Sequence, residues 1–395
     1  MSKATFFTTA FAVCFATICA FAAAPEFQRV TLTDDFYAEG SALGDFNQDG
    51  QIDVAYGPFI FLGPDFQQKI TVFEPKVFDP ENYSQQFLLF SDDVNHDGWL
   101  DLVEAPWPGE KGYWYENPKG KDGYWPKHFI SDEIGNESQI YTDVNGDGLK
   151  DLVFCKVGYI GFASYDPANP TQPWKWTPVS EKRDYYERYY HGIGAGDVNN
   201  DGFVDILESK GWWENPGKPD HTGPWKWHEF PFARRAANMA VIDIDGDGLN
   251  DVLNADDAHL FGLQWWKALK DANGELTFTR MVLIPEDPDK TPTPIRISQL
   301  HALAVGDFNG NGLPDFVTGK RFWAHGSKGD VEADKPALLL LFTLSRENGQ
   351  ATYTPSVVDD NSGVGTQVTV GDVNKDGKLD ILSGNKKGCH LFIQK

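Results

Sequence analysis

Residues 45–53 read DFNQDGQID, and this nine-residue pattern decides the fold. Written D-x-[ND]-x-[DN]-G-x-x-D, it recurs as seven copies along the 395-residue chain. The copies occupy residues 45–53, 93–101, 143–151, 197–205, 243–251, 307–315 and 372–380. Their starts are 48, 50, 54, 46, 64 and 65 residues apart, an interval that suits one four-stranded propeller blade per copy. The sequence therefore predicts an all-β protein, a seven-bladed β-propeller with one such loop in each blade.

Each loop places oxygen side chains at alternate positions and a glycine at position six, so the backbone can curl and the oxygens converge. That arrangement suits Ca²⁺, and we expect up to seven calcium sites. An Asp at position nine stands where an EF-hand would have a Glu at position twelve, which excludes a helix-loop-helix. One such loop is also typical of an Asx-rich turn, but seven in register favour metal sites. The expected ligands are Asp45, Asn47, Asp49, Asp53, Asp93, Asn95, Asp97, Asp101, Asp143, Asn145, Asp147, Asp151, Asp197, Asn199, Asp201, Asp205, Asp243, Asp245, Asp247, Asp251, Asp307, Asn309, Asn311, Asp315, Asp372, Asn374, Asp376 and Asp380.

The loops differ in the number of carboxylates they offer. The loop at 243–251 has four, the loop at 307–315 has two, and the others have three. Because fewer negative ligands bind Ca²⁺ more weakly, we expect the sixth loop to lose its ion first on chelation. The net charge of −24 and the pI near 4.6 argue against a nucleic-acid partner, which needs a basic surface.

The N-terminus has the pattern of an export signal. Lys3 supplies a positive charge, residues 6–24 are apolar, and small residues such as Ala22 and Ala24 fit a cleavage site. We expect residues 1–24 to be a signal peptide and 25–395 to be one propeller domain, secreted or periplasmic and without a membrane span. The alternative, a membrane anchor, is disfavoured because the apolar segment is short for a span.

The residues around the loops carry a resemblance to a known family. The segments ALGDFN at 42–47, AGDVN at 195–199 and VGDFN at 305–309 look like the FG-GAP or VCBS repeats of integrin-α-like seven-bladed propellers. The resemblance covers essentially the whole mature chain and implies the same fold and calcium loops. It leaves function open, because this fold carries adhesion modules, sugar-binding proteins, polysaccharide lyases and a sugar dehydratase.

The ring needs a closing strand, and the N-terminus offers one. Residues 27–32 precede the first loop and resemble residues 125–130 and 227–230, which end other repeats. We therefore expect residues 27–32 to form the outer strand of the last blade.

The blade topology predicts which residues share the face opposite the calcium loops. We assume that each loop joins the innermost strand of its blade to the second strand. The residue six positions before the first Asp of a loop and the residue five positions after its last Asp then both lie on the face opposite the loops. These positions hold Glu39, Phe87, Glu137, His191, Ala237, His301, Thr366, Pro58, Pro106, Lys156, Lys210, Asp256, Lys320 and Asn385. Cationic and titratable groups are thus concentrated on one side of a strongly acidic protein. The alternative is that each Lys or Arg merely neutralises an acidic neighbour.

Two groups of candidate site residues follow. The candidate catalytic residues are His191, His301, Tyr190, Lys210, Lys320 and Arg321. The candidate substrate-binding residues are Glu137, Lys156, Arg234, Asp256, Trp323 and His325. A divalent metal held by His191 and His301, with Glu137 or Asp256, is an additional hypothesis.

Aromatic residues point to carbohydrate. Residues 113–118 read YWYENP and residues 211–216 read GWWENP, and flat indole faces suit sugar rings. These hairpins look similar to those of aldos-2-ulose dehydratase-like propellers. The alternative is that most Trp side chains pack between blades, and Trp323 is the one favoured for ligand contact.

Two functions remain open. One is a carbon–oxygen lyase, a polysaccharide lyase or sugar dehydratase, in which a His or Tyr removes a proton beside a carbonyl or carboxylate, and Lys, Arg or a metal stabilises the resulting negative charge. The other is a non-catalytic adhesion module that binds glycan or a protein partner. The sequence has no nucleophile elbow, phosphate loop, Rossmann fingerprint or HExxH motif, which argues against esterase, kinase, dehydrogenase and metalloprotease chemistry.

Overall fold

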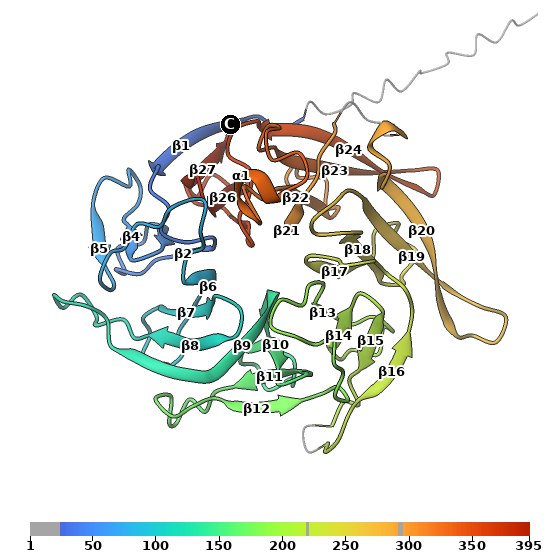
Figure 1. The fold of residues 1–395 in the computed structure, drawn as a ribbon, viewed down its shortest axis with the longest axis horizontal. Helices are drawn as coiled ribbons and strands as arrows, with labels where there is room; N and C mark the ends of the chain where they lie inside the picture. The colour runs from blue at the N-terminus through green and yellow to red at the C-terminus, as the bar shows by residue number, and fades with distance from the viewer. Residues whose placement is uncertain (1–23, 219–220, 291–294) are drawn as a thin grey trace, which may run out of the picture.

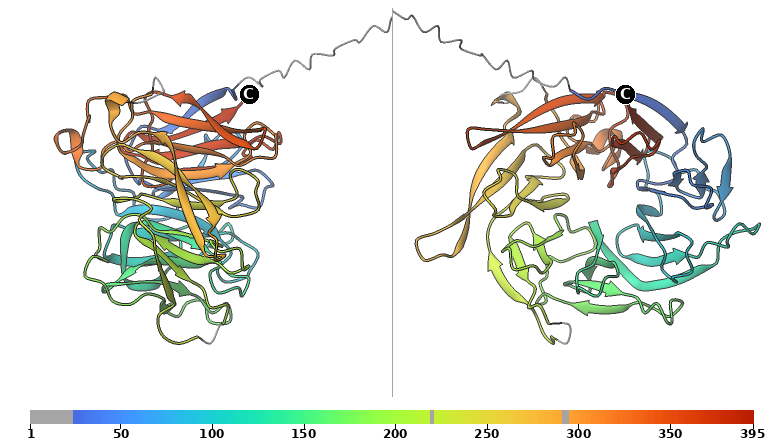
Figure 2. Two further views of the ribbon diagram at one scale, coloured as in Figure 1. Left: turned by 90° about the vertical axis from the view of Figure 1, so that its right-hand side faces the viewer. Right: turned by 180° about the vertical axis from the view of Figure 1, so that it is seen from behind.

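The computed structural model describes residues 24–218, 221–290 and 295–395, which build an all-β, β-propeller-like fold. Figure 1 shows the sheets side by side around a central axis. Figure 2 shows the same ring from the side and from behind. The expected all-β class is confirmed. The predicted signal peptide lies outside the described residues except for its last residue, and no helix among the described residues is long and apolar enough to cross a membrane.

Two of the sheets are separate four-stranded antiparallel units. The first consists of β2 (Ser41–Gly44), β3 (Asp53–Tyr56), β4 (Phe59–Phe61) and β5 (Lys69–Thr71). The other consists of β21 (Leu300–Gly306), β22 (Asp315–Lys320), β23 (Leu339–Glu347) and β24 (Gln350–Asp359). A short helix, α1 (Gly326–Gly329), lies between β22 and β23, and the 3-10 helix η1 (Pro288–Lys290) precedes β21.

Two larger sheets are each made of two antiparallel units. The first contains β6 (Gln86–Asp92), β7 (Asp101–Pro106), β8 (Glu110–Tyr115), β9 (Lys127–Thr142), β10 (Asp151–Lys156), β11 (Tyr159–Ser164) and β12 (Lys175–Pro178). Its two units share β9, which pairs first with β8 and then with β10. The second contains β13 (Gly194–Gly196), β14 (Asp205–Glu208), β15 (Gly211–Glu214), β16 (Lys226–Glu229), β17 (Met239–Ile242), β18 (Asp251–Ala255), β19 (Leu263–Lys270) and β20 (Leu276–Ile284). One parallel pair, Gly194 with Met239, joins its units.

The last sheet unites the two ends of the described chain. It contains β25 (Thr369–Gly371), β26 (Asp380–Asn385), β27 (Gly388–Gln394) and β1 (Phe27–Thr33). β1 runs antiparallel to β27, beginning with the pair Phe27 and Gln394. Figure 1 shows the blue β1 beside the red β27. The expectation that residues 27–32 become the outer strand of the last unit is confirmed.

The aspartate at position nine of each loop begins the second strand of its unit. Asp101 is typical: its side chain is fully buried, Oδ2 accepts a hydrogen bond from Val94 N at 3.0 Å and Oδ1 accepts one from Asn117 N at 2.8 Å. One carboxylate thereby fastens the loop to both the second and the third strand. The repeat is therefore a folding signal in its own right.

The hydrophobic core lies between neighbouring sheets. In one cluster, Leu253 and Trp265 of one sheet pack with Phe316 and Phe342 of the next. Each fully buried side chain of this kind contributes about 1.5–3 kcal/mol. Trp114 and Trp213 are also fully buried, Trp114 between the two units of the seven-stranded sheet and Trp213 against β10 and β11 of that sheet, so packing between units accounts for these two indoles.

The Trp-Glu-Asn-Pro hairpins fasten neighbouring units together. Asn215 Nδ2 donates to Val204 O at 3.0 Å in its own unit and to Val144 O at 2.9 Å in the preceding one. Asn117 makes the same pair of bonds, to Leu100 O and Phe46 O. The asparagine of this motif thus has a structural role that does not depend on any catalytic activity.

Candidate functional site

Three histidine side chains converge beside the central axis. His191 lies just before β13, His259 in the connection from β18 to β19, and His301 in β21. Their ring centroids are 4.7 Å (191–259), 5.1 Å (259–301) and 5.6 Å (191–301) apart. One ring nitrogen of each lies within 4.8 Å of the other two. We call these residues the histidine cluster.

Backbone carbonyls fix the orientation of two of the rings. His191 Nδ1 lies 2.8 Å from Tyr189 O, and His301 Nδ1 lies 3.2 Å from Gln299 O. Because a carbonyl can only accept, each Nδ1 carries the proton and each Nε2 keeps a free lone pair. Among the described residues, neither Nε2 has a hydrogen-bond partner, and neither does His259 Nδ1.

Unpartnered buried nitrogens cost free energy unless something else satisfies them. Burial lowers the pKa of His191 and His301, and it lowers the pKa of His259 to about 3, assisted by the neighbouring His191 and His325. The imidazoles are therefore neutral near pH 7, the form that coordinates a metal. Three neutral imidazole nitrogens at this spacing fit a divalent transition metal with one coordination position left open.

A buried charge network borders the histidine cluster. Arg321 donates from Nε to Glu39 Oε2 at 2.8 Å and from Nη1 to Glu137 Oε2 at 2.7 Å. The same Glu137 oxygen lies 3.6 Å from His191 Nε2. Burial alone would raise the pKa of Glu137, but attraction to His191 in its protonated form and to the permanently charged Arg321 outweighs burial and holds that pKa below its usual value. Glu137 is therefore an ionised carboxylate beside the cluster, and Arg321 Nη2 is a buried donor with no partner among the described residues.

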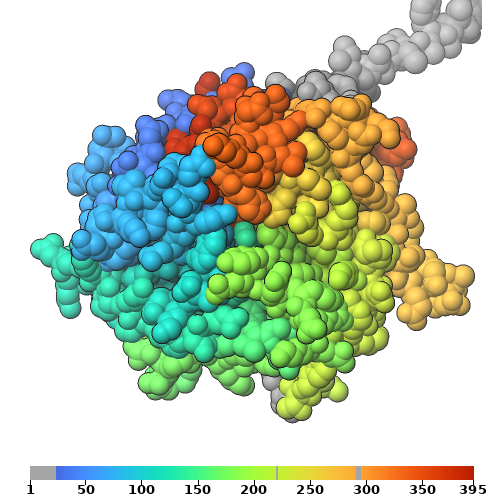
Figure 3. Space-filling view, in the orientation of Figure 1, coloured from blue at the N-terminus to red at the C-terminus, as the bar shows by residue number. Residues whose placement is uncertain are grey.

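The cluster opens toward the segment that contains α1. The ring of His325 lies 4.6 Å from that of His259, and its side chain is 52% exposed. On the same side, Ser327 N donates to Glu81 Oε2 at 3.1 Å, so the segment around residue 81 meets α1. Figure 3 shows these segments, blue and orange, meeting near the centre of this face. Trp323 Nε1 donates to Ala333 O at 3.0 Å, which directs the indole nitrogen into its own loop.

Several predicted site residues have partners away from the histidine cluster. Tyr190 donates to Glu208 at 2.5 Å, and Lys210 lies 3.6 Å from the centroid of the Tyr185 ring. Lys320 is buried and donates to Ser298 Oγ at 2.9 Å and to Glu332 O at 2.8 Å. None of these contacts of Lys210 and Lys320 is with a carboxylate, so both lysines have structural partners other than the acidic neighbours that the alternative expected.

The remaining three predicted residues form ion pairs. Lys156 pairs with Asp132, and Arg234 pairs with Asp256 at 2.6 Å. The structure thus brings together His191, His301, Glu137 and Arg321 from the prediction, and places Glu137 rather than Asp256 beside the histidines.

The sequence prediction missed His259. The signal was present, because His259 follows Asp256 closely on the face where His191 and His301 were expected. The connection after β18 turns back, and Gln299 Nε2 donates to His259 O at 2.8 Å. That contact brings His259 beside β21.

The loops have a donor set that fits a hard cation. In the first loop, the two oxygens of Asp45 accept the N–H groups of Asp49 and Gly50 at 3.1 and 3.0 Å. Asn47 Oδ1 accepts the N–H of Asp49 at 3.0 Å. In the fifth loop, one carboxylate oxygen from each of Asp243, Asp245 and Asp247 lies within 4.8 Å of the others, but Lys267 already pairs with Asp245 and Asp247 there. Convergent carboxylate and amide oxygens are the ligands that Ca²⁺ prefers.

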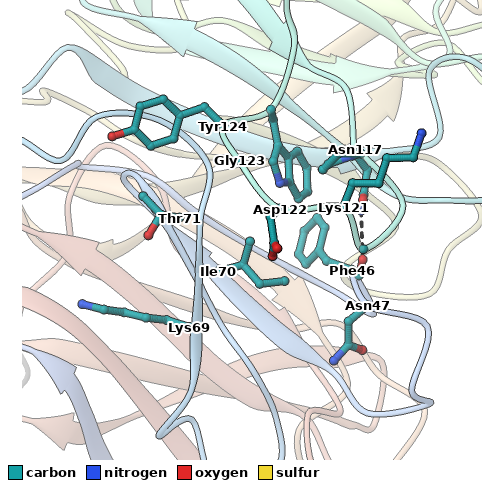
Figure 4. A pocket seen from close by; sticks show the side chains of 13 residues that line it. Phe46, Asn47, Lys69, Ile70, Thr71, Asn117, Lys121, Asp122, Gly123 and Tyr124 are labelled. Atoms are coloured by element: carbon teal, nitrogen blue, oxygen red, sulfur yellow. Dashed lines mark hydrogen bonds between the residues drawn. The ribbon is translucent and has the colours of Figure 1, made fainter.

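Two pockets are lined by residues of the first two units of the ring. One, of about 330 Å³, includes Phe46, Lys69 and Tyr124. Figure 4 shows its lining and the bond from Asn117 to Phe46. The other, of about 640 Å³, is lined by the aromatic residues Tyr83, Trp107 and Tyr113 and by Lys76, Lys111 and Lys127 among others. The Trp107 ring lies 5.8 Å from that of Tyr189, whose carbonyl orients His191.

Comparison with known proteins supports the repeat. A family model described as an FG-GAP-like repeat matches residues 243–318, from the fifth loop into β22. No curated protein matches the chain. A solved structure of an Agrocybe aegerita lectin, described as recognising non-reducing terminal N-acetylglucosamine, is 18% identical with a TM-score of 0.45, covering 74% of this chain and 73% of that one. A likeness at this level says nothing about what this chain binds. The family match and the ring of sheets together show an FG-GAP repeat in a β-propeller-like fold.

Proposed function

We propose that the protein is a secreted, seven-bladed calcium propeller whose histidine cluster binds a divalent transition metal and acts on carbohydrate by β-elimination. The observation that carries this proposal is the convergence of one ring nitrogen from each of three histidines, each of which also has an unpartnered ring nitrogen among the described residues. The blade count rests on the seven loops, each of which leads into the second strand of an antiparallel unit.

The groups around the cluster suit proton removal beside a carboxylate or carbonyl. A bound metal would polarise that oxygen as a Lewis acid. Glu137, held ionised next to His191, would accept the proton, a C–C double bond would form, and the C–O bond at the β-carbon would break with its electron pair leaving on oxygen. Arg321 Nη2 would donate to the oxygen on which negative charge develops. This assignment moves the base from a histidine to Glu137, because the histidine lone pairs would serve the metal.

The pocket of about 640 Å³ suits the rest of such a substrate. Its volume lies within the range of small-molecule sites, and its aromatic walls suit the apolar faces of sugar rings. Three lysines of the lining, Lys76, Lys111 and Lys127, outnumber its two acids, Glu104 and Glu110, in a protein of net charge −24, and this excess favours an acidic sugar. The contact between Trp107 and Tyr189 links this pocket to the cluster.

Two measurements on one set of variants test the proposal. The first is the content of zinc, manganese, iron and nickel in purified protein. The second is the rise in absorbance from unsaturated product on uronate-containing polysaccharides and keto-sugars. His259→Ala should lose both metal and activity. His128→Ala is the matched control, because His128 pairs with Glu116 on an outer hairpin and should change neither. Full metal content and turnover in His259→Ala would overturn the proposal.

A non-catalytic glycan-binding module is the second candidate. The side chain of Tyr189 is 41% exposed beside the cluster, and such a ring can bind a sugar without chemistry. Binding on a glycan array that is weakened by Tyr189→Ala, with no unsaturated product from any substrate, would favour this candidate.

A further inference from the structure

The fifth loop, residues 243–251, differs from the other six in two ways that coincide. It alone has an aspartate at position three, Asp245, where the others have asparagine. It alone also has a cation opposite its position-nine aspartate on the third strand of the unit. In the fifth unit Val252 pairs with Trp266, so the preceding Asp251 lies opposite Lys267. The same register places an uncharged or acidic residue opposite the aspartate in each of the other units: Leu62, Glu116, Ser164, Glu214, Thr343 and Ile393.

Lys267 reaches into the fifth loop. Its Nζ donates to Asp245 Oδ2 and lies 3.1 Å from Asp247 Oδ2. Positions three and five are two of the places from which the loop would offer oxygens to an ion. The side chain of Asp245 is only 6% exposed, so the lysine covers it from solvent.

The contact with Lys267 offsets the charge of the one additional carboxylate in the fifth loop. Four carboxylates, at positions 243, 245, 247 and 251, carry a charge of −4, and Lys267 brings the sum to −3. A loop with three aspartates and one asparagine, such as residues 45–53, has the same −3 with no lysine. The additional carboxylate therefore matches the additional ammonium.

We infer that the ammonium of Lys267 takes the place of calcium in the fifth loop, so that this loop is held together without a metal ion. The inference rests on the proposed calcium loading of the other loops. It reverses the order expected from carboxylate count, in which the fifth loop would bind calcium most tightly. Ca²⁺ needs six to eight oxygen ligands, and an ammonium that already occupies two of the loop oxygens prevents that number from assembling.

The test counts calcium ions bound per chain at saturation, by equilibrium dialysis and elemental analysis. Lys267→Met should bind one ion more than the wild type. The double variant Asp245→Asn with Lys267→Met restores the pattern of the other loops, and it should also gain one ion. Lys119→Met is the matched control, because Lys119 pairs with Asp97 alone in the second loop and is 46% exposed. It should leave the count unchanged.

The outcomes separate the proposed calcium loading of the loops from the inference that Lys267 replaces calcium in the fifth loop. If the wild type binds several ions and neither Lys267 variant gains one, the inference is overturned while calcium loading stands. If the wild type and both Lys267 variants bind no calcium, both proposals fail. A gain equally large in Lys119→Met would show a general effect of removing positive charge, and this too would overturn the inference.

Discussion

Replacing Arg321 by methionine should destabilise the protein strongly near neutral pH. Arg321 is 1% exposed and lies between two buried carboxylates, those of Glu39 at 2.8 Å and Glu137 at 2.7 Å. Removing one partner of a buried ion pair costs about 3–5 kcal/mol, because it leaves an uncompensated buried charge. Arg321→Met leaves two such charges, so we expect a loss of at least that size. Such a loss is a large fraction of the roughly 5–15 kcal/mol that stabilises a typical protein.

The assay is urea unfolding followed by tryptophan fluorescence at pH 7.5 and pH 5. The loss of unfolding free energy should be smaller at pH 5, because carboxylates that no longer pair with Arg321 are more readily protonated there. Adding Glu39→Gln to Arg321→Met should recover part of the stability. Lys335→Met is the control, because its pair with Asp334 is exposed on both sides and is worth at most about 1 kcal/mol. If Arg321→Met were no more destabilising than this control at either pH, the burial argument would be refuted.

Three further predictions concern the ring. Deleting residues 25–33 removes β1 and leaves β27 with an unpaired edge, so the urea midpoint should fall; an unchanged midpoint would contradict closure by β1. Asn215→Ala leaves two carbonyl groups without a donor and should cost about 2–4 kcal/mol in urea unfolding, whereas Asn273→Ala in an exposed turn should cost almost nothing. Burial raises the pKa of Glu104, so the stability that this carboxyl group contributes is present below its usual pKa and is lost as the pH rises. As the pH rises from 4 to 8, Glu104→Gln should therefore become more stable relative to the wild type. If the difference between the urea midpoints of the two proteins stayed constant over this range, the pKa of Glu104 would not be raised.

Much of the fold could be predicted from the sequence because its signals are local and repeated. The nine-residue loop places its last aspartate at the start of a strand, and the structure shows that this carboxylate bonds to the loop backbone and the next strand. The closing role of residues 27–32 was also predictable, since that segment resembles the outer strands of other repeats.

The candidate site was predicted only in part. His191, His301 and Glu137 were found because each lies six residues before a loop, and Arg321 because it follows a strand end. His259 was missed because its position depends on how the connection after β18 turns back toward β21. The strand-end lysines were expected at the site, yet Lys320 bonds within its own loop segment.

The sequence by itself determined the all-β class, the order of loops and strands, and the strand that closes the ring. Those features depend on residues a few positions apart, and each copy repeats the same local contacts. Only the tertiary structure decided which histidines meet, which carboxylate Arg321 shares with His191, and that Lys267 enters the fifth loop. Such contacts join segments from different strands or different sheets, and their geometry is set by how the sheets pack around the axis rather than by any pattern along the chain.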